Sequence, residues 1–317
     1  MSNNTMGRSA RRGWLAVAAC LGLLGAWGLA GCGGGGDAGS GAPVPAQRLV
    51  GEIFGPPTHL ASSELKFTAG YTGDLATSRA LAATARASLL DALFMFHPGG
   101  GAATAAPVPD AAQRLDQWAS NNADLLVPGT RVLILDEVFW QPGVASQVAL
   151  SASELTARLN GLRSAVALVR QRLPQVSIGI TVTPYVVIDV APEDGVRVRA
   201  ALAQALALVD WVATDPYWYG QPDLVPALLE WSRDFHAFAR AAQPRIETWL
   251  VAQAFKDPSW DSATYRSFIA QLLGHAERYD HIIFYGWQLV GGLPDTALGR
   301  FFDAPTRALY AKYLLQP

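Results

Sequence analysis

Two adjacent acidic residues follow the most apolar strand-like segment of the chain. Arg131-Val-Leu-Ile-Leu135 leads directly into Asp136-Glu137 and, three residues later, Trp140. A run of four aliphatic residues is typical of a strand buried on both faces, as in a parallel sheet. Adjacent acids beside such a strand are costly unless they have a partner or a chemical task. We therefore expect Glu137 to be a functional residue.

Other strand-like segments also end in polar or aromatic residues. Asp215 lies near the end of one and Gln253 near the end of another. Aromatic rings beside polar groups are typical of sugar-binding sites, because rings stack on the CH faces of a sugar while polar groups pair with its hydroxyls. The candidate substrate-binding residues are His97, Trp140, Tyr185, Tyr217, Trp218, Tyr219, Gln253, Tyr285, Trp287 and Gln288.

Hydrolysis of a glycosidic bond uses paired carboxyl groups. One is protonated to assist the leaving alcohol, and usually a second, ionised one lies on the opposite face of the sugar. Our hypothesis is that Glu137 is the general acid, that Asp136 orients it or raises its pKa, and that Asp215 is the base or stabilises the transition state. Glu137 and Asp215 should then lie within about 12 Å of each other. Alternatively, Asp136 pairs with an arginine or caps a loop, and Asp215, which precedes Pro216, starts a turn.

The elements that must position these residues alternate along the chain. We expect strands at 49–54, 65–69, 92–97, 131–135, 176–183, 210–217, 247–255 and 281–288. Helices are expected at 75–90, 109–125, 151–173, 192–209, 222–242, 261–276 and 305–315. The clearest helix begins with a capping box formed by Ser151 and Glu154, has apolar residues every three or four positions, and ends before Pro174.

This alternation predicts an α/β protein in which residues 48–317 form a single (β/α)₈ TIM barrel. In such barrels the carboxyl ends of the strands converge on one mouth, which carries the chemistry. The alternative is an open doubly wound sheet. It is disfavoured because the first strand-to-helix turn, Phe54-Gly-Pro-Pro57, lacks the glycine fingerprint of dinucleotide-binding folds.

The arrangement resembles the (β/α)₈ glycoside hydrolases. The resemblance implies that Glu137, at the end of the fourth strand, is the acid/base, and it matches Asp215-Pro-Tyr217 and Trp287 to residues after the sixth and eighth strands. The large retaining clan also has a nucleophilic glutamate after the seventh strand, where this chain has Gln253. Chitinase-like barrels instead combine an acidic cluster with a tyrosine and use the substrate's acetamido group as nucleophile. Asp136-Glu137 with Tyr217 resembles a shortened form of that set.

The first 47 residues resemble the leader of a bacterial lipoprotein. Three arginines precede an apolar run from Trp14 to Leu29, and Leu29-Ala-Gly-Cys32 resembles a lipobox. We expect residues 1–31 to be a signal peptide and residues 32–47 a Gly/Ser/Pro-rich flexible tether with lipidated Cys32. Gly33 in place of aspartate favours the outer membrane, with the domain facing the periplasm or the surface. The alternative is a permanent transmembrane anchor.

Composition limits the other possibilities. Loss of the leader's three arginines would take the formal charge from -2 to -5, which argues against a nucleic-acid binder. The expected domain contains no cysteine and its histidines lack ligand spacing, so we predict no metal and no cofactor. We expect a monomer whose partners are a carbohydrate substrate and, through its lipid anchor, a membrane.

The sequence thus predicts a glycoside hydrolase that acts on an oligo- or polysaccharide at the cell envelope. One alternative is a non-catalytic carbohydrate-binding lipoprotein with a degenerate hydrolase barrel, in which Gln253 marks a lost activity. Another is an envelope scaffold, for which side chains would block the mouth of the barrel.

Overall fold

The computed structural model describes residues 48–53, 68–71, 75–84, 86–95, 106–140, 150–256, 259–285 and 304–314. The predicted signal peptide, 1–31, and the predicted tether, 32–47, with Cys32, lie outside the described residues, and so do His97, Trp287 and Gln288. The described strands form a closed parallel barrel in chain order, in which the last strand pairs with the first. The structure therefore confirms the predicted (β/α)₈ fold.

The strands of the barrel are short and consecutive. They are β1 (Val50–Ile53), β2 (Ala69–Tyr71), β3 (Ala87–Asp91), β4 (Arg131–Leu135), β5 (Ser177–Val182), β6 (Trp211–Thr214), β7 (Glu247–Gln253) and β8 (His281–Tyr285). The four aliphatic residues of β4 are all buried, as expected of a strand covered on both faces.

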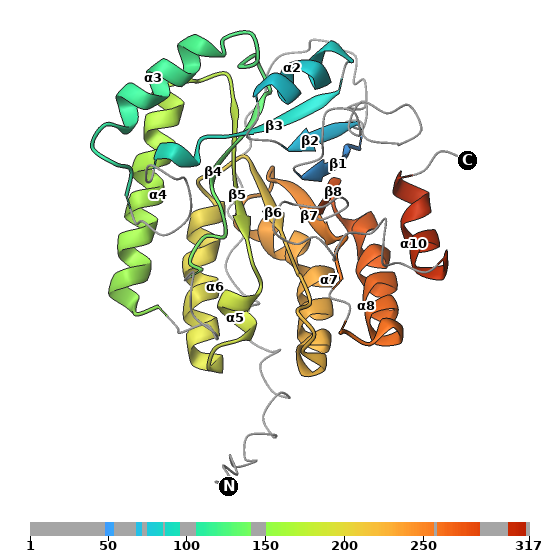
Figure 1. Cartoon of the computed structure of the whole chain (residues 1–317). Helices are drawn as coiled ribbons and strands as arrows, with labels where there is room; N and C mark the ends of the chain where they lie inside the picture. The colour runs from blue at the N-terminus through green and yellow to red at the C-terminus, as the bar shows by residue number, and fades with distance from the viewer. Residues whose placement is uncertain are drawn as a thin grey trace, which may run out of the picture. The chain divides into compact units, whose positions relative to one another are not determined.

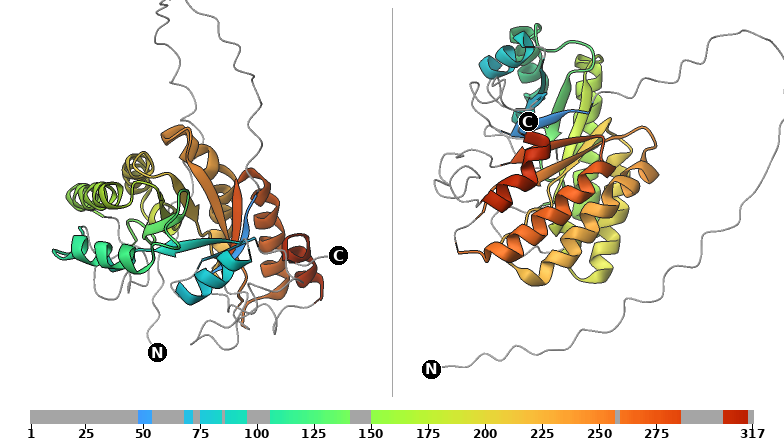
Figure 2. Two further views of the ribbon diagram at one scale, coloured as in Figure 1. Left: turned by 90° about the horizontal axis from the view of Figure 1, so that it is seen from above. Right: turned by 90° about the vertical axis from the view of Figure 1, so that its right-hand side faces the viewer.

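Helices lie around the outside of the strands (Figure 1). They are α2 (Leu75–Ala83), α3 (Ala111–Asn121), α4 (Ala152–Arg172), α5 (Tyr185–Ile188), α6 (Pro192–Leu206), α7 (Val225–Ala242), α8 (Ser262–His275) and α10 (Ala304–Leu314). The described residues also contain the short 3₁₀ turns η1 (Leu93–Met95), η2 (Pro222–Leu224) and η3 (Ala276–Arg278). Both views in Figure 2 show α6, α7 and α8 against the outer face of the barrel. No helix in the described ranges is long and apolar enough to cross a membrane.

The predicted capping box at the start of α4 is present. The Ser151 hydroxyl accepts the Glu154 N–H, and the Glu154 carboxylate accepts the Ser151 N–H at 2.7 Å. The apolar residues at three- and four-residue spacing along this helix are buried, which explains why it was the clearest helix in the sequence.

The sequence prediction was wrong between residues 65 and 97. The expected helix 75–90 ends at Ala83, and its last part is strand β3. In the described part of the expected third strand, residues 92–95, the chain forms the 3₁₀ turn η1, and the second strand begins at Ala69. Alanine-rich composition favours a helix locally, but pairing of β3 with β2 and β4 on both sides outweighs this preference.

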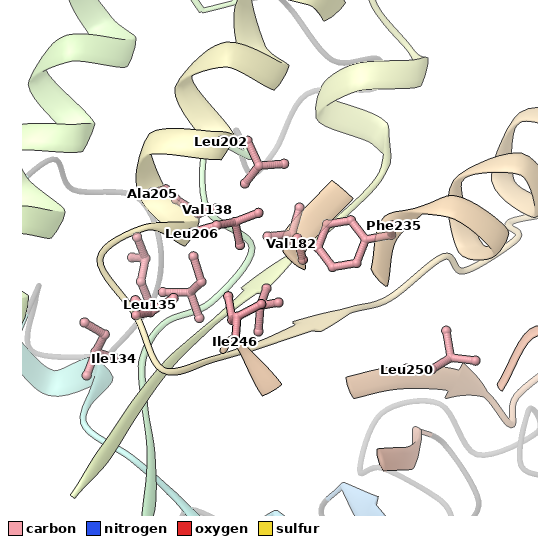
Figure 3. Packing of buried hydrophobic residues seen from close by; sticks show 14 of the residues in the cluster. Ile134, Leu135, Val138, Val182, Leu202, Ala205, Leu206, Phe235, Ile246 and Leu250 are labelled. Carbon is pink, nitrogen blue, oxygen red and sulfur yellow. The ribbon is translucent and has the colours of Figure 1, made fainter. Parts of the chain in front are cut away.

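Two apolar layers hold the barrel together. The larger lies between the strands and the surrounding helices, and Figure 3 shows part of it, with Leu202 and Leu206 of α6 near Leu135 and Val182 of the strands. The smaller fills the barrel interior and includes Trp211 and Trp249. A Cβ at Gly179 would lie 2.0 Å from the Trp211 ring, so glycine at this position makes room for the indole.

An ion pair closes the amino ends of the strands. Arg131 contacts Glu247 through two hydrogen bonds of 2.6 and 2.7 Å. The Nδ1 of His281 accepts the Leu49 N–H at 2.9 Å, which leaves Nε2 to carry the proton, 3.3 Å from Glu247. The interior below the mouth is therefore packed and ion-paired, as in other barrels of this type.

Candidate active site

A cavity of about 340 Å³ opens at the carboxyl ends of the strands. Its base is formed by interior residues such as Leu133, Trp211 and Val251. Its polar lining consists of Asp91, Asp136, Glu137, Asp215 and Thr181, and its aromatic lining of Tyr71, Tyr217, Tyr219 and Tyr285. This is the end of the barrel at which the sequence predicted the chemistry, and the described side chains do not fill it.

A register shift in β4 determines which acidic side chains reach this cavity. The pairing of β4 with β5 is irregular between Leu133 and Leu135. Leu133 faces the barrel interior, whereas both Ile134 and Leu135 pack in the outer layer. Asp136 consequently returns to the interior side and lines the cavity together with Glu137. Strict two-residue alternation would have placed Asp136 on the outside.

Thr181 of β5 fixes the backbone that carries the two acids. Its hydroxyl donates to the Asp136 carboxylate and accepts the Glu137 N–H at 2.5 Å, while its carbonyl accepts the Val138 N–H at 3.0 Å. Glu137 has φ 44°, in the left-handed region that few residues other than glycine adopt. Backbone strain of this kind persists where the surrounding contacts impose it, and it is concentrated at functional sites.

The carboxyl groups of Glu137 and Asp215 both line the cavity, and each influences the pKa of the other. Burial, followed by repulsion from Asp136, raises the pKa of Glu137 to about 7. Asp215 is only 6% exposed, and burial and then repulsion from Glu137 raise the pKa of Asp215 well above its ordinary value. Two neighbouring buried carboxyl groups cannot both ionise easily, so the Glu137–Asp215 pair holds a proton around neutral pH.

A second pair of acidic groups lies beside the first. Asp91, at the end of β3, accepts hydrogen bonds from the Tyr71 hydroxyl and from the Leu93 N–H. Burial is the main cause that raises the pKa of both Asp91 and Asp136, and repulsion from Asp136 adds to the shift at Asp91. The sequence analysis did not predict Asp91 and Tyr71 as residues of the site. Asp91 would have been found if the strand at residues 87–91 had not been assigned to a helix.

Tyrosine rings form one wall of the cavity. Tyr217 stacks on Tyr285 with ring centres 5.4 Å apart and an interplanar angle of 25°. Tyr219 contacts Tyr217 edge-on and remains 48% exposed, so its ring is accessible at the rim. Exposed and half-buried tyrosine rings beside carboxyl groups are suited to stacking against a sugar.

Four predicted substrate-binding residues do not line the cavity. Gln253 is fully buried: its amide oxygen accepts the Trp218 N–H at 2.7 Å, and its amide nitrogen donates to the carbonyls of Trp218 and Phe255. Trp218 packs against Trp260 and Tyr265. The Tyr185 hydroxyl donates to the Tyr217 carbonyl, and Trp140 packs against the outer core. These four side chains pack outside the described lining of the cavity, and their contact with substrate stays a prediction.

The described lining of the cavity contains no lysine, arginine or histidine. Within the same described part of the chain, no three histidine, cysteine, aspartate or glutamate residues are grouped in a way that could hold a metal ion. The charged chemistry of the described cavity is therefore carboxylic.

Comparison with known proteins identifies the fold. No protein-family model matches the chain, and no curated protein matches its sequence.

A psychrophilic glycoside hydrolase family 10 endo-beta-1,4-xylanase superposes with TM-score 0.52 at 8% identity, over 83% of this chain and 96% of the xylanase. A thermostable mutant of the xylanase Xyn10A from Cellvibrio japonicus superposes with TM-score 0.52 at 12% identity, over 84% and 97%. The beta-galactosidase from Rahnella sp. R3 matches at TM-score 0.48 and 10% identity over 84% of this chain, which spans 55% of that enzyme. The two xylanases establish a glycoside hydrolase-like TIM-barrel fold.

Proposed function

We propose that the chain is a glycoside hydrolase that cleaves an oligo- or polysaccharide, with Glu137 as general acid and Asp215 as base or transition-state stabiliser. The observation that carries the proposal is the contact of these two carboxyl groups, borne by different strands, in a tyrosine-walled cavity at the mouth of the barrel. With its pKa raised to about 7 by burial and by Asp136, Glu137 is protonated in a substantial fraction of molecules near neutral pH. A general acid requires this protonation.

The proposed reaction begins when a sugar enters between the two carboxyl groups. Glu137 donates its proton to the glycosidic oxygen, the bond from that oxygen to the anomeric carbon breaks, and the alcohol leaves. With the proton of the pair on Glu137, Asp215 is ionised, and it stabilises the positive charge that develops at the anomeric carbon. A water oxygen then bonds to that carbon, and its proton is lost to Asp215 as base or to solvent. Hydrolases hold such carboxyl groups about 5 to 5.5 Å or about 6.5 to 9.5 Å apart. The proposal requires the Glu137 and Asp215 carboxyl groups to adopt one of these separations when a sugar is bound.

Replacement of Glu137 by glutamine tests the proposal. The leaderless domain is assayed against a panel of glycans, and on any glycan that it cleaves Glu137→Gln should lower kcat by about 10²- to 10⁴-fold. The matched control is Glu193→Gln, at an exposed position in the first turn of α6, which should cleave like the wild type. Equal turnover by Glu137→Gln and the wild type would refute the role of Glu137.

The second candidate is a carbohydrate-binding protein without activity. One observation favours it: Gln253 is hydrogen-bonded to backbone groups at the position where retaining enzymes of similar fold have their nucleophile. In this case no glycan in the panel would be cleaved, while the wild type and Glu137→Gln would bind one of them with similar affinity.

We also propose that the domain is held at the cell envelope, in the outer membrane, by a lipid on Cys32. The lipobox-like segment ending at Cys32 and the glycines that follow support this location. Full-length protein made in a bacterial host should fractionate with outer membranes and incorporate a labelled fatty acid. Cys32→Ser should abolish the label, and a labelled Cys32→Ser protein would contradict the proposal.

A further inference from the structure

The cavity contains more acidic groups than hydrolysis requires. Glu137 and Asp215 suffice for acid and base, yet Asp91 and Asp136 lie in the same cavity close enough to repel each other. Such a concentration of carboxyl groups destabilises the fold, because each is partly or fully removed from water. No cationic side chain of the described lining compensates them. A bound group could supply the missing positive charge.

Asp215 provides an independent indication that a ligand donates hydrogen bonds here. Its Oδ1 is buried and has no hydrogen-bond partner in the described structure, although the residue lines the cavity and is only 6% exposed. A buried acceptor left unpaired costs free energy, and a ligand that donates a hydrogen bond to Asp215 would offset that cost.

The charge of the cavity separates the classes of sugar. A uronic acid or a sulfated sugar would bring a further negative charge beside Asp91, Asp136 and the acidic pair, without a described basic residue to receive it. A neutral sugar offers hydroxyl donors but leaves the charges uncompensated. An ammonium group provides three N–H donors and a positive charge, and its hydrogen bonds to carboxylates are the stronger, charge-assisted type.

We propose that the sugar unit held in this cavity carries a free amino group, so that the substrate is a glycan containing de-N-acetylated hexosamine, with Asp91 and Asp136 as the ammonium acceptors. Asp91 is oriented by the Tyr71 hydroxyl and the Leu93 N–H, and Asp136 by the Thr181 hydroxyl. Both carboxyl groups are thus held in position before the sugar binds. That this sugar is a substrate depends on the proposed function. That an amino sugar binds is argued only from the residues that line the cavity.

Binding of single sugars tests the inference without knowledge of the linkage. Glucosamine, galactosamine and mannosamine are each titrated by NMR into the leaderless domain, beside the N-acetylated and the hydroxyl counterpart of the same sugar. At least one hexosamine should bind about ten- to a hundredfold more tightly than both of its counterparts. If no amine is preferred over its counterparts, the inference is wrong.

Asp91→Asn tests the assigned acceptors. It should reduce the preference for the amine over the hydroxyl counterpart by about tenfold or more, because a charged acceptor becomes a neutral one of the same shape. Asp223→Asn, at an exposed residue outside the cavity, is the matched control and should retain the wild-type preference. A preference that Asp91→Asn leaves unchanged would refute Asp91 as an acceptor.

These measurements distinguish failure of the inference from failure of the proposed function. Amine-selective binding by a protein that cleaves no glycan would refute the hydrolase and leave the inference standing. Cleavage of a neutral glycan, with no amine preferred in the titrations, would support the hydrolase and overturn the inference.

Discussion

The Glu137 side chain is placed at a cost to the stability of the fold. Its backbone has a positive φ, and its carboxyl group is buried beside two other acids. Both features destabilise the native state, and both are typical of functional positions. Replacement of Glu137 should therefore increase stability while it lowers the proposed activity, so the two effects can be measured separately.

Glu137→Gln should therefore stabilise the protein at high pH. The folded pKa of Glu137 is raised from 4.5 to about 7, so its contribution is most favourable below pH 4.5 and is lost as the pH rises through 7. We expect the variant to exceed the wild type in free energy of unfolding by about 1 to 3 kcal/mol at pH 8, and by much less at pH 5. Urea denaturation at both pH values measures this, with Glu193→Gln as control. A variant less stable than the wild type at pH 8 would contradict the assigned burial cost.

Restoring the glutamate of retaining enzymes at position 253 should not create a nucleophile. The amide nitrogen of Gln253 donates to the carbonyls of Trp218 and Phe255. A glutamate carboxylate would place an acceptor oxygen opposite these two acceptor carbonyls. Gln253→Glu should lower the free energy of unfolding by about 2 to 4 kcal/mol without raising activity. Denaturant unfolding and the glycan assay check this beside Gln271→Glu on the exposed face of α8, which should change stability by less than about 0.5 kcal/mol. Increased activity in Gln253→Glu would show that the side chain reaches substrate.

Part of the site could be predicted from residue type and position alone. Glu137 and Asp215 follow buried strands, and parallel strands bring their ends together, so the convergence of these two residues required only the barrel. The backbone hydrogen bonds of Gln253 and the packing of Trp218 could not be predicted, because a position at a strand end does not reveal which groups a side chain contacts. Asp91 was missed through an error in the element that carries it.

At the scale of elements, local preference and tertiary pairing compete in the first third of the barrel. The five residues of β3 include alanine and serine and lack β-branched side chains, so nothing in their sequence favours a strand. From β4 onward, aliphatic runs and a capped amphipathic helix allowed the alternation of strands and helices to be predicted from the sequence. The register shift in β4 had no signal in the sequence, yet it determines that Asp136 faces the cavity.

The interior packing of β5 against β6 yields an element-scale prediction. A methyl group at Gly179 would meet the Trp211 ring at 2.0 Å, in an interior that is closed on all sides by other strands. Gly179→Ala should lower the free energy of unfolding by about 3 kcal/mol or more. Gly274→Ala in α8, where an added Cβ meets no atom within 4 Å, should be neutral or stabilise by up to about 1 kcal/mol. Thermal and urea unfolding compare the two, and a Gly179→Ala protein as stable as Gly274→Ala would contradict the close approach of Trp211.

At the scale of the whole barrel, the two ends have opposite electrostatics. The mouth gathers carboxyl groups whose pKa values are raised, whereas at the amino ends of the strands Glu247 is surrounded by hydrogen-bond donors: Arg131, His281 and the Trp249 indole. Burial alone would raise the pKa of Glu247, but the hydrogen bonds from His281 and Arg131 outweigh burial and lower it to about 2. The ion pairs at the closed end thus stabilise the fold, whereas the buried carboxyl groups at the mouth destabilise it, as expected if the mouth is a functional site on a rigid scaffold.

Glu247→Gln should consequently lose stability in the pH range opposite to that of Glu137. With a folded pKa of about 2 against an ordinary value of 4.5, Glu247 contributes fully above pH 4.5, and the contribution is lost as the pH falls through 2. The variant should be less stable than the wild type by about 3 kcal/mol at pH 6, and the difference should shrink as the pH is lowered to 3 and below. Urea denaturation at these pH values measures it, and Glu193→Gln should show no such trend. Only in acid is Glu247 protonated and therefore as neutral a partner for Arg131 as glutamine. The same loss of stability at every pH would mean that packing, rather than charge, explains the role of Glu247.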